Sequence, residues 1–187
     1  MSKLYIVRHA QVKVDFRIRS SEWSISEEGI HATRQLVLNQ SWNDVQRIYH
    51  SPERKAAGTA EVMSAMTGIP MTVVNDLREL SVPHIDASDE FIRRVGAYLM
   101  GFPDPEFENW DQATQRIVGA IAAIVAEAYG HSAAVVSHGR ILTVWFSHLF
   151  QRRMSVAEWQ SIRLPDLSVI DLDTGTVEKG FFSDISV

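Results

Sequence analysis

A short apolar run near the N-terminus, which ends in an arginine and a histidine, constrains the fold more than any other feature. Residues 4–7 read Leu-Tyr-Ile-Val, which suits a buried strand in length and in β-forming side chains. Arg8 and His9 follow directly, and a second run of this kind, residues 133–137, is followed by His138. Ligands bind beyond the carboxyl ends of the strands in an open parallel sheet. The sequence therefore predicts a fold that brings two histidines and an arginine together as a site for a phosphoryl group.

Strand and helix patterns alternate along the rest of the chain. Two capping-box patterns and one Ser-Pro pair indicate the starts of three helices: Ser24 with Glu27, Ser155 with Glu158, and Ser51 with Pro52. Helices are expected at about residues 24–39, 51–67, 88–100, 111–128, 139–150 and from 155, and further strands at residues 47–50, 71–74, 167–172 and 176–182. This alternation predicts one α/β domain over residues 1–187, a three-layer α/β/α sandwich whose mainly parallel sheet is closed by an antiparallel edge.

The composition and charge of the chain exclude several kinds of protein. With 187 residues, of which 45% are hydrophobic, the chain is long enough for a sizeable core. Its net charge of −5 argues against a general nucleic-acid surface, and its lack of cysteine excludes disulfides, thiolate metal sites and cysteine nucleophiles. No apolar run approaches the ~20 residues of a membrane span, and no signal-peptide core precedes residue 4. We therefore expect a cytoplasmic protein that binds neither membrane nor nucleic acid. A homo-oligomer is compatible with the sequence.

Four short motifs follow one another along the chain. They read Val7-Arg8-His9-Ala10, Ser51-Pro52-Glu53-Arg54-Lys55-Ala56-Ala57-Gly58-Thr59-Ala60, Leu77-Arg78-Glu79 and Ser137-His138-Gly139. Together they resemble the hallmarks of the histidine phosphatase superfamily, the fold of the phosphoglycerate mutases and of many small phosphatases. Each motif alone is a weak signal. Four in the family's order and approximate spacing, spread over most of the chain, are a specific one.

The residues at the two strand ends suit phosphoryl transfer, which needs an in-line nucleophile, positive donors on the equatorial oxygens and an acid for the leaving oxygen. We assign His9 as the nucleophile, because a neutral imidazole attacks at pH 7 without a strong base. Arg8 would hold phosphoryl oxygens through its planar fork. Protonated His138 and the helix amides that begin at Gly139 would donate further bonds. The resemblance implies the same roles, since in the family the first histidine is phosphorylated and the second lies across the phosphate from it.

The third motif supplies the candidate acid. The resemblance implies that Glu79 protonates the leaving oxygen and afterwards serves as the base for water, a role that requires a raised pKa. Asp76 is a second candidate for this role.

The chain departs from the family's pattern at several positions. Lys55 falls on the position of the family's arginine, where it keeps the charge but loses the bidentate fork. The neighbouring Arg54 would point about 100° away from Lys55 on a helix. Asp15 stands where many members have asparagine, and we assign it, with Arg17, to substrate binding. A solvated loop is the alternative interpretation of these two residues.

The sequence favours a metal-independent phosphomonoester hydrolase that forms a phosphohistidine on His9 and needs no cofactor. Its expected partner is a small phosphorylated substrate or a phosphoprotein. A phosphomutase is the alternative enzyme, although few residues lie between Glu79 and the second histidine to shape a sugar-phosphate pocket. A phosphate-binding regulatory module with weakened catalysis is the alternative of another class, motivated by Ala10, Asp15 and Lys55.

Two other kinds of site are excluded by spacing. The remaining histidines lack the close His/Glu spacing of a zinc site, such as H-E-x-x-H, so no metal is expected. No G-x-S-x-G pattern surrounds Ser137, which argues against a serine hydrolase.

Overall fold

A six-stranded mixed sheet forms the centre of the molecule, in the order β3-β2-β4-β1-β5-β6. The computed structural model describes residues 2–83 and 88–181. The strands are β1 (Lys3–Arg8), β2 (Val45–His50), β3 (Met71–Val73), β4 (Ser132–Ser137), β5 (Asp166–Asp171) and β6 (Val177–Lys179). The first four run parallel, and β5 and β6 run antiparallel to their neighbours. The predicted α/β fold with an antiparallel edge is confirmed. Residue 182, at the end of the last expected strand, lies outside the described residues.

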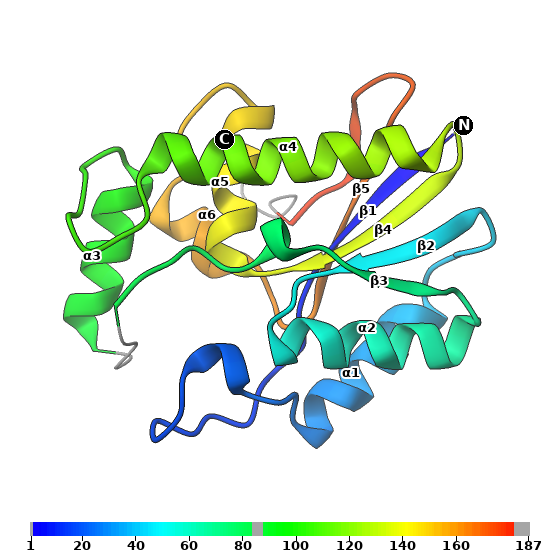
Figure 1. Ribbon diagram of the computed structural model, residues 1–187, viewed down its shortest axis with the longest axis horizontal. Helices are drawn as coiled ribbons and strands as arrows, with labels where there is room; N and C mark the ends of the chain where they lie inside the picture. The colour runs from blue at the N-terminus through cyan, green and yellow to red at the C-terminus, as the bar shows by residue number, and fades with distance from the viewer. Residues whose placement is uncertain (1, 84–87, 182–187) are drawn as a thin grey trace.

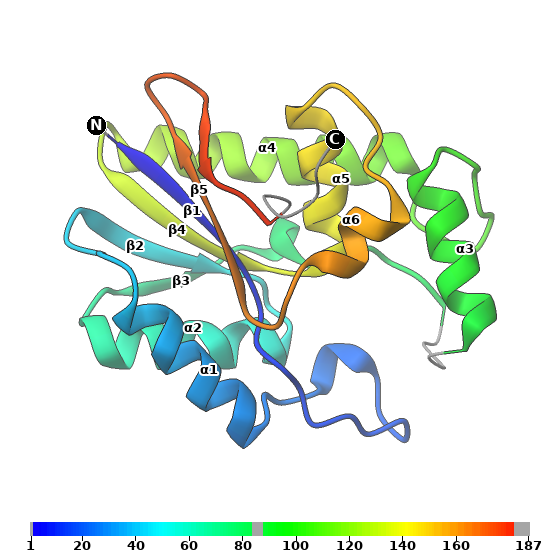
Figure 2. The same cartoon turned by 180° about the vertical axis from the view of Figure 1, so that it is seen from behind.

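Helices cover both faces of this sheet (Figures 1 and 2). They are α1 (Glu27–Leu38), α2 (Arg54–Thr67), α3 (Asp89–Leu99), α4 (Trp110–Ala128), α5 (Gly139–Leu149) and α6 (Val156–Ser161). α1 and α2 lie on one face and α4 and α5 on the other, which makes the expected sandwich, while α6 packs against both α3 and α5. Within the described part of the chain, no helix combines the length and the apolar character that crossing a membrane requires.

The apolar run at the N-terminus fills two cores at once. Side chains alternate between the two faces of a strand, so Leu4 and Ile6 pack with α4 and α5. Tyr5 and Val7 pack with α1 and α2 on the opposite face. A central strand buried on both faces reads as a continuous apolar run, which explains why β1 was recognisable from sequence alone.

The starts of two helices differ in their capping from the sequence expectation. The predicted box of Ser24 with Glu27 is wrong: Ser26 is the N-cap of α1, and its side chain accepts a hydrogen bond from the Gly29 N–H. An isolated bridge between Val12 and Ile25 keeps the chain extended up to that point. The second predicted box, Ser155 with Glu158, is confirmed at α6.

The second helix begins later than its Ser-Pro pair suggested. α2 starts at Arg54, and its N-cap residue Glu53 makes no side-chain capping bond. The Ser51 hydroxyl instead lies 2.7 Å from Nε2 of His138. The serine expected to cap a helix therefore belongs to the edge of the sheet where β1, β2 and β4 end.

Two short 3-10 helices flank that edge. η1 (Ser20–Glu22) packs against α2, and η2 (Asn75–Leu77) packs against α4. Both lie in segments that the sequence analysis treated as loops. Arg8 is paired with Ser137 in the sheet register. His9 and His138, the residues that follow β1 and β4, therefore lie next to each other at this edge.

Candidate active site

The two motif histidines meet at the carboxyl ends of β1 and β4. His9 follows β1 and His138 follows β4, and their ring centroids lie 5.1 Å apart with the planes tilted by 60°. The His9 backbone N–H donates a 2.9 Å hydrogen bond to the Ser137 carbonyl, which ties the two strand ends together. Both side chains are buried. The juxtaposition expected from the sequence is therefore present, and its chemical role stays a prediction.

His9 is held in one tautomer. Its Nδ1 lies 2.8 Å from the Ala10 carbonyl oxygen, which can only accept, so Nδ1 carries the ring proton and Nε2 carries the lone pair. Burial, with the nearby His138 and Lys55 charges, holds the pKa of His9 well below its usual range. The ring is therefore neutral at pH 7, with one nitrogen available for attack, as a nucleophile requires.

His138 makes a hydrogen bond through Nε2, and its Nδ1 is buried without a hydrogen-bond partner among the described residues. The Ser51 hydroxyl accepts the Glu53 N–H at 3.2 Å and can donate its own proton to Nε2 of His138. Nδ1 then carries the ring proton. Burial holds the pKa of His138 well below its usual range, against the opposing effect of Glu79. We expected His138 to be protonated when phosphate is bound, and this stays a prediction.

Buried donors converge on this pair of histidines. In the part of the chain that the structure describes, Nε of Arg8, Nδ1 of His138 and Nε of Arg140 are buried and make no hydrogen bond. Leaving a buried polar group unsatisfied costs about 1–3 kcal/mol. Since arginine nitrogens only donate, the arrangement suits an anion. In the same part of the chain, no group of three or more His, Asp or Glu residues could hold a metal ion.

Arg8 is packed against the first residue of α5. Its guanidinium donates a hydrogen bond to the Ile162 carbonyl. A Cβ atom placed on Gly139 would lie 3.0 Å from both Cζ and Nε of Arg8. Glycine at this position therefore lets the guanidinium lie against the N-terminus of α5, where backbone amides favour an anion.

Adding one methyl group at Gly139 should therefore weaken anion binding. We expect Gly139→Ala to displace the Arg8 guanidinium and to weaken the binding of inorganic phosphate about 10- to 100-fold, the worth of one charge-assisted hydrogen bond. Titration calorimetry measures this. Gly119→Ala is the control, because a Cβ there meets no atom within 4 Å. Equal phosphate affinity of the Gly139 variant and the wild type would remove Arg8 as a phosphate ligand.

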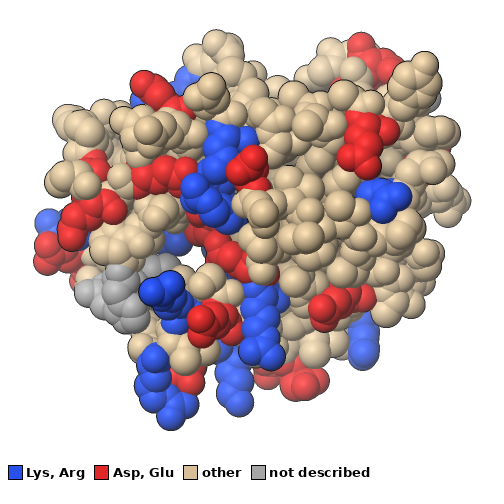
Figure 3. Space-filling model, viewed as in Figure 1, with Lys and Arg blue, Asp and Glu red and all other residues tan. Residues whose placement is uncertain are grey.

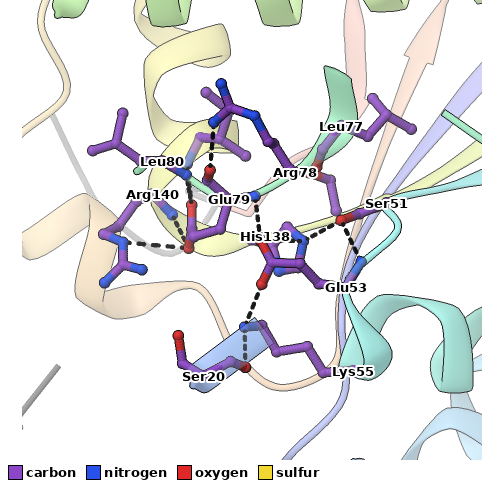
Figure 4. A network of polar contacts seen from close by, with 12 residues as sticks. Ser20, Ser51, Glu53, Lys55, Leu77, Arg78, Glu79, Leu80, His138 and Arg140 are labelled. Carbon is purple, nitrogen blue, oxygen red and sulfur yellow. Dashed lines mark hydrogen bonds and ion pairs between the residues drawn. The ribbon is translucent and has the colours of Figure 1, made fainter. Parts of the chain in front are cut away.

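Lys55 is buried, as the helix geometry predicted, and its neighbour Arg54 is exposed. Its Nζ donates to the Ser20 carbonyl at 2.8 Å and to Oε2 of Glu53 at 2.7 Å (Figure 4). Two of the three ammonium protons are therefore engaged within the protein. Lys55 is held in an ion pair with Glu53, so its positive charge is partly neutralised, and its contact with a phosphoryl group stays a prediction.

Glu79 is bound to the start of α5 (Figure 4). Oε1 accepts the N–H groups of Leu80 at 2.8 Å and Ile141 at 2.9 Å, and Oε2 lies 3.3 Å from the Arg140 N–H. Oε2 also forms an ion pair with Nε of Arg140 at 3.4 Å, outside hydrogen-bond geometry.

These contacts decide the ionisation of Glu79. Burial by itself raises its pKa, but Arg140, His138 and the Leu80 amide outweigh burial and lower the pKa to about 2. The free protein therefore lacks the raised pKa that the role of a proton donor requires. In the free protein the carboxylate accepts hydrogen bonds, and this environment opposes its use as a proton donor.

The two predicted substrate-binding residues lie in the loop between β1 and α1, where they pair with each other. Arg17 donates to both carboxylate oxygens of Asp15, at 2.8 Å and 2.7 Å, and its side chain is 88% exposed. Neither residue lines the cavity that Glu53, Glu79 and Arg140 border, whereas Arg19 of the same loop does. Substrate binding by Asp15 and Arg17 stays a prediction.

That cavity has a volume of about 560 Å³ and is lined by side chains of both charges. Its charged walls are formed by Arg19, Glu53, Arg78, Glu79 and Arg140. Figure 3 shows a hollow on this side of the molecule, with Lys and Arg (blue) and Asp and Glu (red) around it. Such a cavity can take a small, polar, anionic molecule.

Sequence analysis missed three residues of this site: Ser51, Glu53 and Arg140. Arg140 directly follows the fourth motif, and its position in the first turn of a helix after His138 was the available signal. Ser51 and Glu53 lie inside the second motif, but Ser51 was interpreted as a helix cap and Glu53 was given no role. Their contacts depend on chain segments far away in sequence.

Comparisons with known proteins identify the family model that the chain matches and the folds that it resembles. A family model described as the histidine phosphatase superfamily, branch 1, matches residues 4–181. No curated protein matches the chain. The fold is similar to that of YhfR from Bacillus stearothermophilus, with a TM-score of 0.76, 21% sequence identity, and 100% of this chain and 98% of that chain covered.

Two further solved structures have named activities. A phosphoglycerate mutase from Bacillus anthracis str. Sterne has a TM-score of 0.74 and 19% identity, with 96% of this chain and 92% of that chain covered. A phosphoserine phosphatase from Entamoeba histolytica, in complex with 3-phosphoglyceric acid, has a TM-score of 0.72 and 15% identity, with 95% and 94% covered. At such identities the likeness establishes the fold.

Proposed function

This chain belongs to the histidine phosphatase superfamily, and we propose that it is a metal-independent phosphomonoester hydrolase that works through a phosphohistidine on His9. One observation carries the proposal. A buried, neutral His9 has its lone pair on Nε2, and a second buried histidine lies 5.1 Å away, ring centroid to ring centroid. This tautomer and this spacing are what a nucleophile and an opposing donor need on the two sides of a phosphoryl group.

The reaction has two steps. In the first, Nε2 of His9 forms a bond to phosphorus, the ester P–O bond breaks, and the leaving oxygen takes the P–O–H proton that the phosphate ester carries when it binds as its monoanion. In the second, water attacks the phosphohistidine, the P–N bond breaks, and Glu79 accepts the proton of the water. Arg8, Lys55, His138 and the amides at Gly139 stabilise the phosphoryl charge in both steps.

A hydrolase fits the chain better than a mutase, although relatives of both kinds share the fold. Between Glu79 and His138 most of the chain forms α3, α4 and β4, so little of it can shape a sugar-phosphate pocket. Three arginines, Arg19, Arg78 and Arg140, line the cavity, which supports a small phosphate ester with a further negative group as substrate.

The test is phosphate release from 4-nitrophenyl phosphate, with and without EDTA. We expect turnover that EDTA leaves unchanged and a phosphoryl group on the protein that is labile in acid, as a phosphohistidine is. Loss of activity in EDTA, with recovery on adding a divalent metal, would contradict metal independence. Transfer of phosphate between the hydroxyls of a phosphoglycerate without release would favour the mutase. Binding of inorganic phosphate without turnover would favour the regulatory module.

A further inference from the structure

A second cavity, of about 410 Å³, lies between the end of α3 and the start of α4 and is bordered by Arg153 from the segment after α5. The loop that joins α3 to α4 forms much of its wall (Figure 1). None of the described residues that line this α3–α4 cavity also lines the 560 Å³ cavity beside Glu79. Pockets for small molecules commonly measure about 300–1,000 Å³, so the α3–α4 cavity has room for a ligand of its own.

The walls of the α3–α4 cavity are mainly apolar. Four aromatic side chains and two prolines line it: Tyr98, Phe102, Phe107, Trp110, Pro103 and Pro105. The ring centroid of Tyr98 lies 5.5 Å from that of Phe107 and 5.4 Å from that of Trp110, so these three rings form one packed surface. Phe102 is exposed. Because aromatic rings pack well against one another, this lining favours a ligand with a flat apolar part.

One charge in the wall of the α3–α4 cavity is not compensated. The carboxylate of Asp104 is bound by both arms of the Arg94 guanidinium, at 2.8 Å and 2.7 Å. The carboxylate of Glu108 is bound by two further arginines. Among the described residues, the Arg153 guanidinium has no hydrogen-bond or ion-pair partner. The charge that a ligand must supply here is therefore negative.

Arg153 is held in a fixed place at the wall of the α3–α4 cavity. Its Cζ lies 3.4 Å from the centroid of the Trp110 ring. On another side, a Cβ atom placed on Gly101 would lie 3.9 Å from its Nε. A guanidinium that stacks on a ring keeps its N–H groups free in its own plane, where they can bind both oxygens of a carboxylate. Arg153 is therefore positioned to bind an anion.

A hydroxyl group at the same wall also has no partner. Tyr98 is 2% exposed, and its hydroxyl is buried without a hydrogen bond to any described residue. Burial raises the pKa of Tyr98, so the hydroxyl keeps its proton at pH 7. The charged groups that act on this hydroxyl include Glu108 and Arg153, which line the same cavity. An oxygen of a bound ligand would give the hydroxyl the partner that it lacks.

We propose that the α3–α4 cavity is a second ligand site, which binds a small aromatic carboxylate. The carboxylate pairs with the guanidinium of Arg153 and reaches the Tyr98 hydroxyl, and the ring of the ligand lies against the aromatic wall. Inorganic phosphate would meet Arg153 but would leave the apolar wall unfilled. This site does not depend on the proposed hydrolase activity, because it lies apart from the phosphoryl site.

A smaller cavity on the other side of the Trp110–Arg153 pair supplies a control. Its volume is about 310 Å³, and Thr114, whose hydroxyl is also buried without a described partner, lines it. Its remaining lining residues are polar: Ser147, His148, Gln151 and Arg152. An aromatic ring gains less from such a wall, so we assign the ligand to the α3–α4 cavity.

The experiment is a titration of the full chain with phenylacetate, followed by NMR at the indole N–H of Trp110. Phenylacetamide is the neutral analogue of similar shape, and acetate is the carboxylate without a ring. We expect phenylacetate to saturate one site with a Kd of about 1 mM or lower. Phenylacetamide and acetate should each bind at least about tenfold more weakly, because one lacks the charge and the other the apolar surface.

Two variants test the residues assigned to the ligand. Arg153→Gln should weaken phenylacetate binding about 10- to 100-fold, the worth of a charge-assisted hydrogen bond. Tyr98→Phe should weaken it about 2- to 10-fold. The same variant should raise the Tm of the free protein, because it removes a buried hydroxyl that has no described partner. A residue that only supported the fold would not shift affinity and Tm in this way.

Two matched controls should keep wild-type affinity. Arg93→Gln removes an exposed arginine of α3, and Thr114→Val removes the unpartnered hydroxyl of the smaller cavity. Equal affinity of wild type and Arg153→Gln, or equal affinity for phenylacetate and phenylacetamide, would overturn the proposed site. A loss in Thr114→Val as large as that in Arg153→Gln would place the ligand in the smaller cavity instead. Failure of phenylacetate to saturate the wild type would also overturn the proposal.

Discussion

Replacing His9 by alanine is expected to lower kcat/KM for 4-nitrophenyl phosphate at least about a thousandfold, or about 4 kcal/mol of transition-state stabilisation. The reason is that the imidazole has no substitute at its position. His9 directly follows β1, its Nδ1 is bound to the Ala10 carbonyl, and His138 on the other side has its Nε2 engaged by Ser51. Alanine removes the only lone pair that the described geometry directs into the site as a neutral nucleophile.

The measurement needs a control for the effect of losing a histidine in general. His31 lies on the exposed side of α1, so His31→Ala should keep wild-type kcat/KM. Mass spectrometry after a rapid quench should detect the added phosphoryl group in the wild type and in the His31 variant and should find none in His9→Ala. A His9 variant that keeps more than about a tenth of the wild-type rate, a loss of less than about 1.4 kcal/mol, would refute the phosphohistidine mechanism.

The parts of the site that sequence reasoning could identify are those positioned by a strand. β1 and β4 are buried on both faces, so the sequence of each strand is a continuous apolar run. The polar residues that follow these runs lie at the edge of the sheet. His9 and His138 were identified in this way. Lys55 was preferred to Arg54 because it falls on the position of the family's arginine and Arg54 would point about 100° away on a helix, and the structure buries Lys55 and exposes Arg54.

The parts that sequence reasoning could not identify depend on contacts between distant segments. Ser24 and Ser26 are both good caps, and the choice of Ser26 follows the bridge between Val12 and Ile25. The contact of Glu79 with Arg140 joins residues 61 positions apart. A local sequence pattern indicates which chemical roles a residue could have. The ionisation of a buried carboxyl group depends on which cation the fold places next to it.

The contacts that keep Glu79 ionised should also stabilise the folded protein. Lowering the pKa of its carboxyl to about 2, from an ordinary 4.5, corresponds to about 3 kcal/mol of folding free energy at neutral pH. We expect Glu79→Ala to lower the free energy of unfolding at pH 7 by about 3–5 kcal/mol, because it leaves Arg140 without its counter-charge in a buried place. Urea unfolding followed by circular dichroism measures the loss. The change would be a large fraction of the total stability of a domain.

The pH dependence of this loss identifies its electrostatic origin. A carboxyl group with a lowered pKa in the folded state stabilises the fold above its unfolded pKa, and this contribution disappears as the pH falls towards the folded value. The difference between wild type and Glu79→Ala should therefore be fully present above about pH 4.5 and shrink between pH 4.5 and about pH 2. Glu61→Ala, exposed on α2, should change stability by less than about 0.5 kcal/mol at every pH.

A Glu79 variant as stable as the wild type at pH 7 would mean that the ion pair with Arg140 contributes no stability. A loss that stays the same at pH 3 would assign it to packing instead of charge.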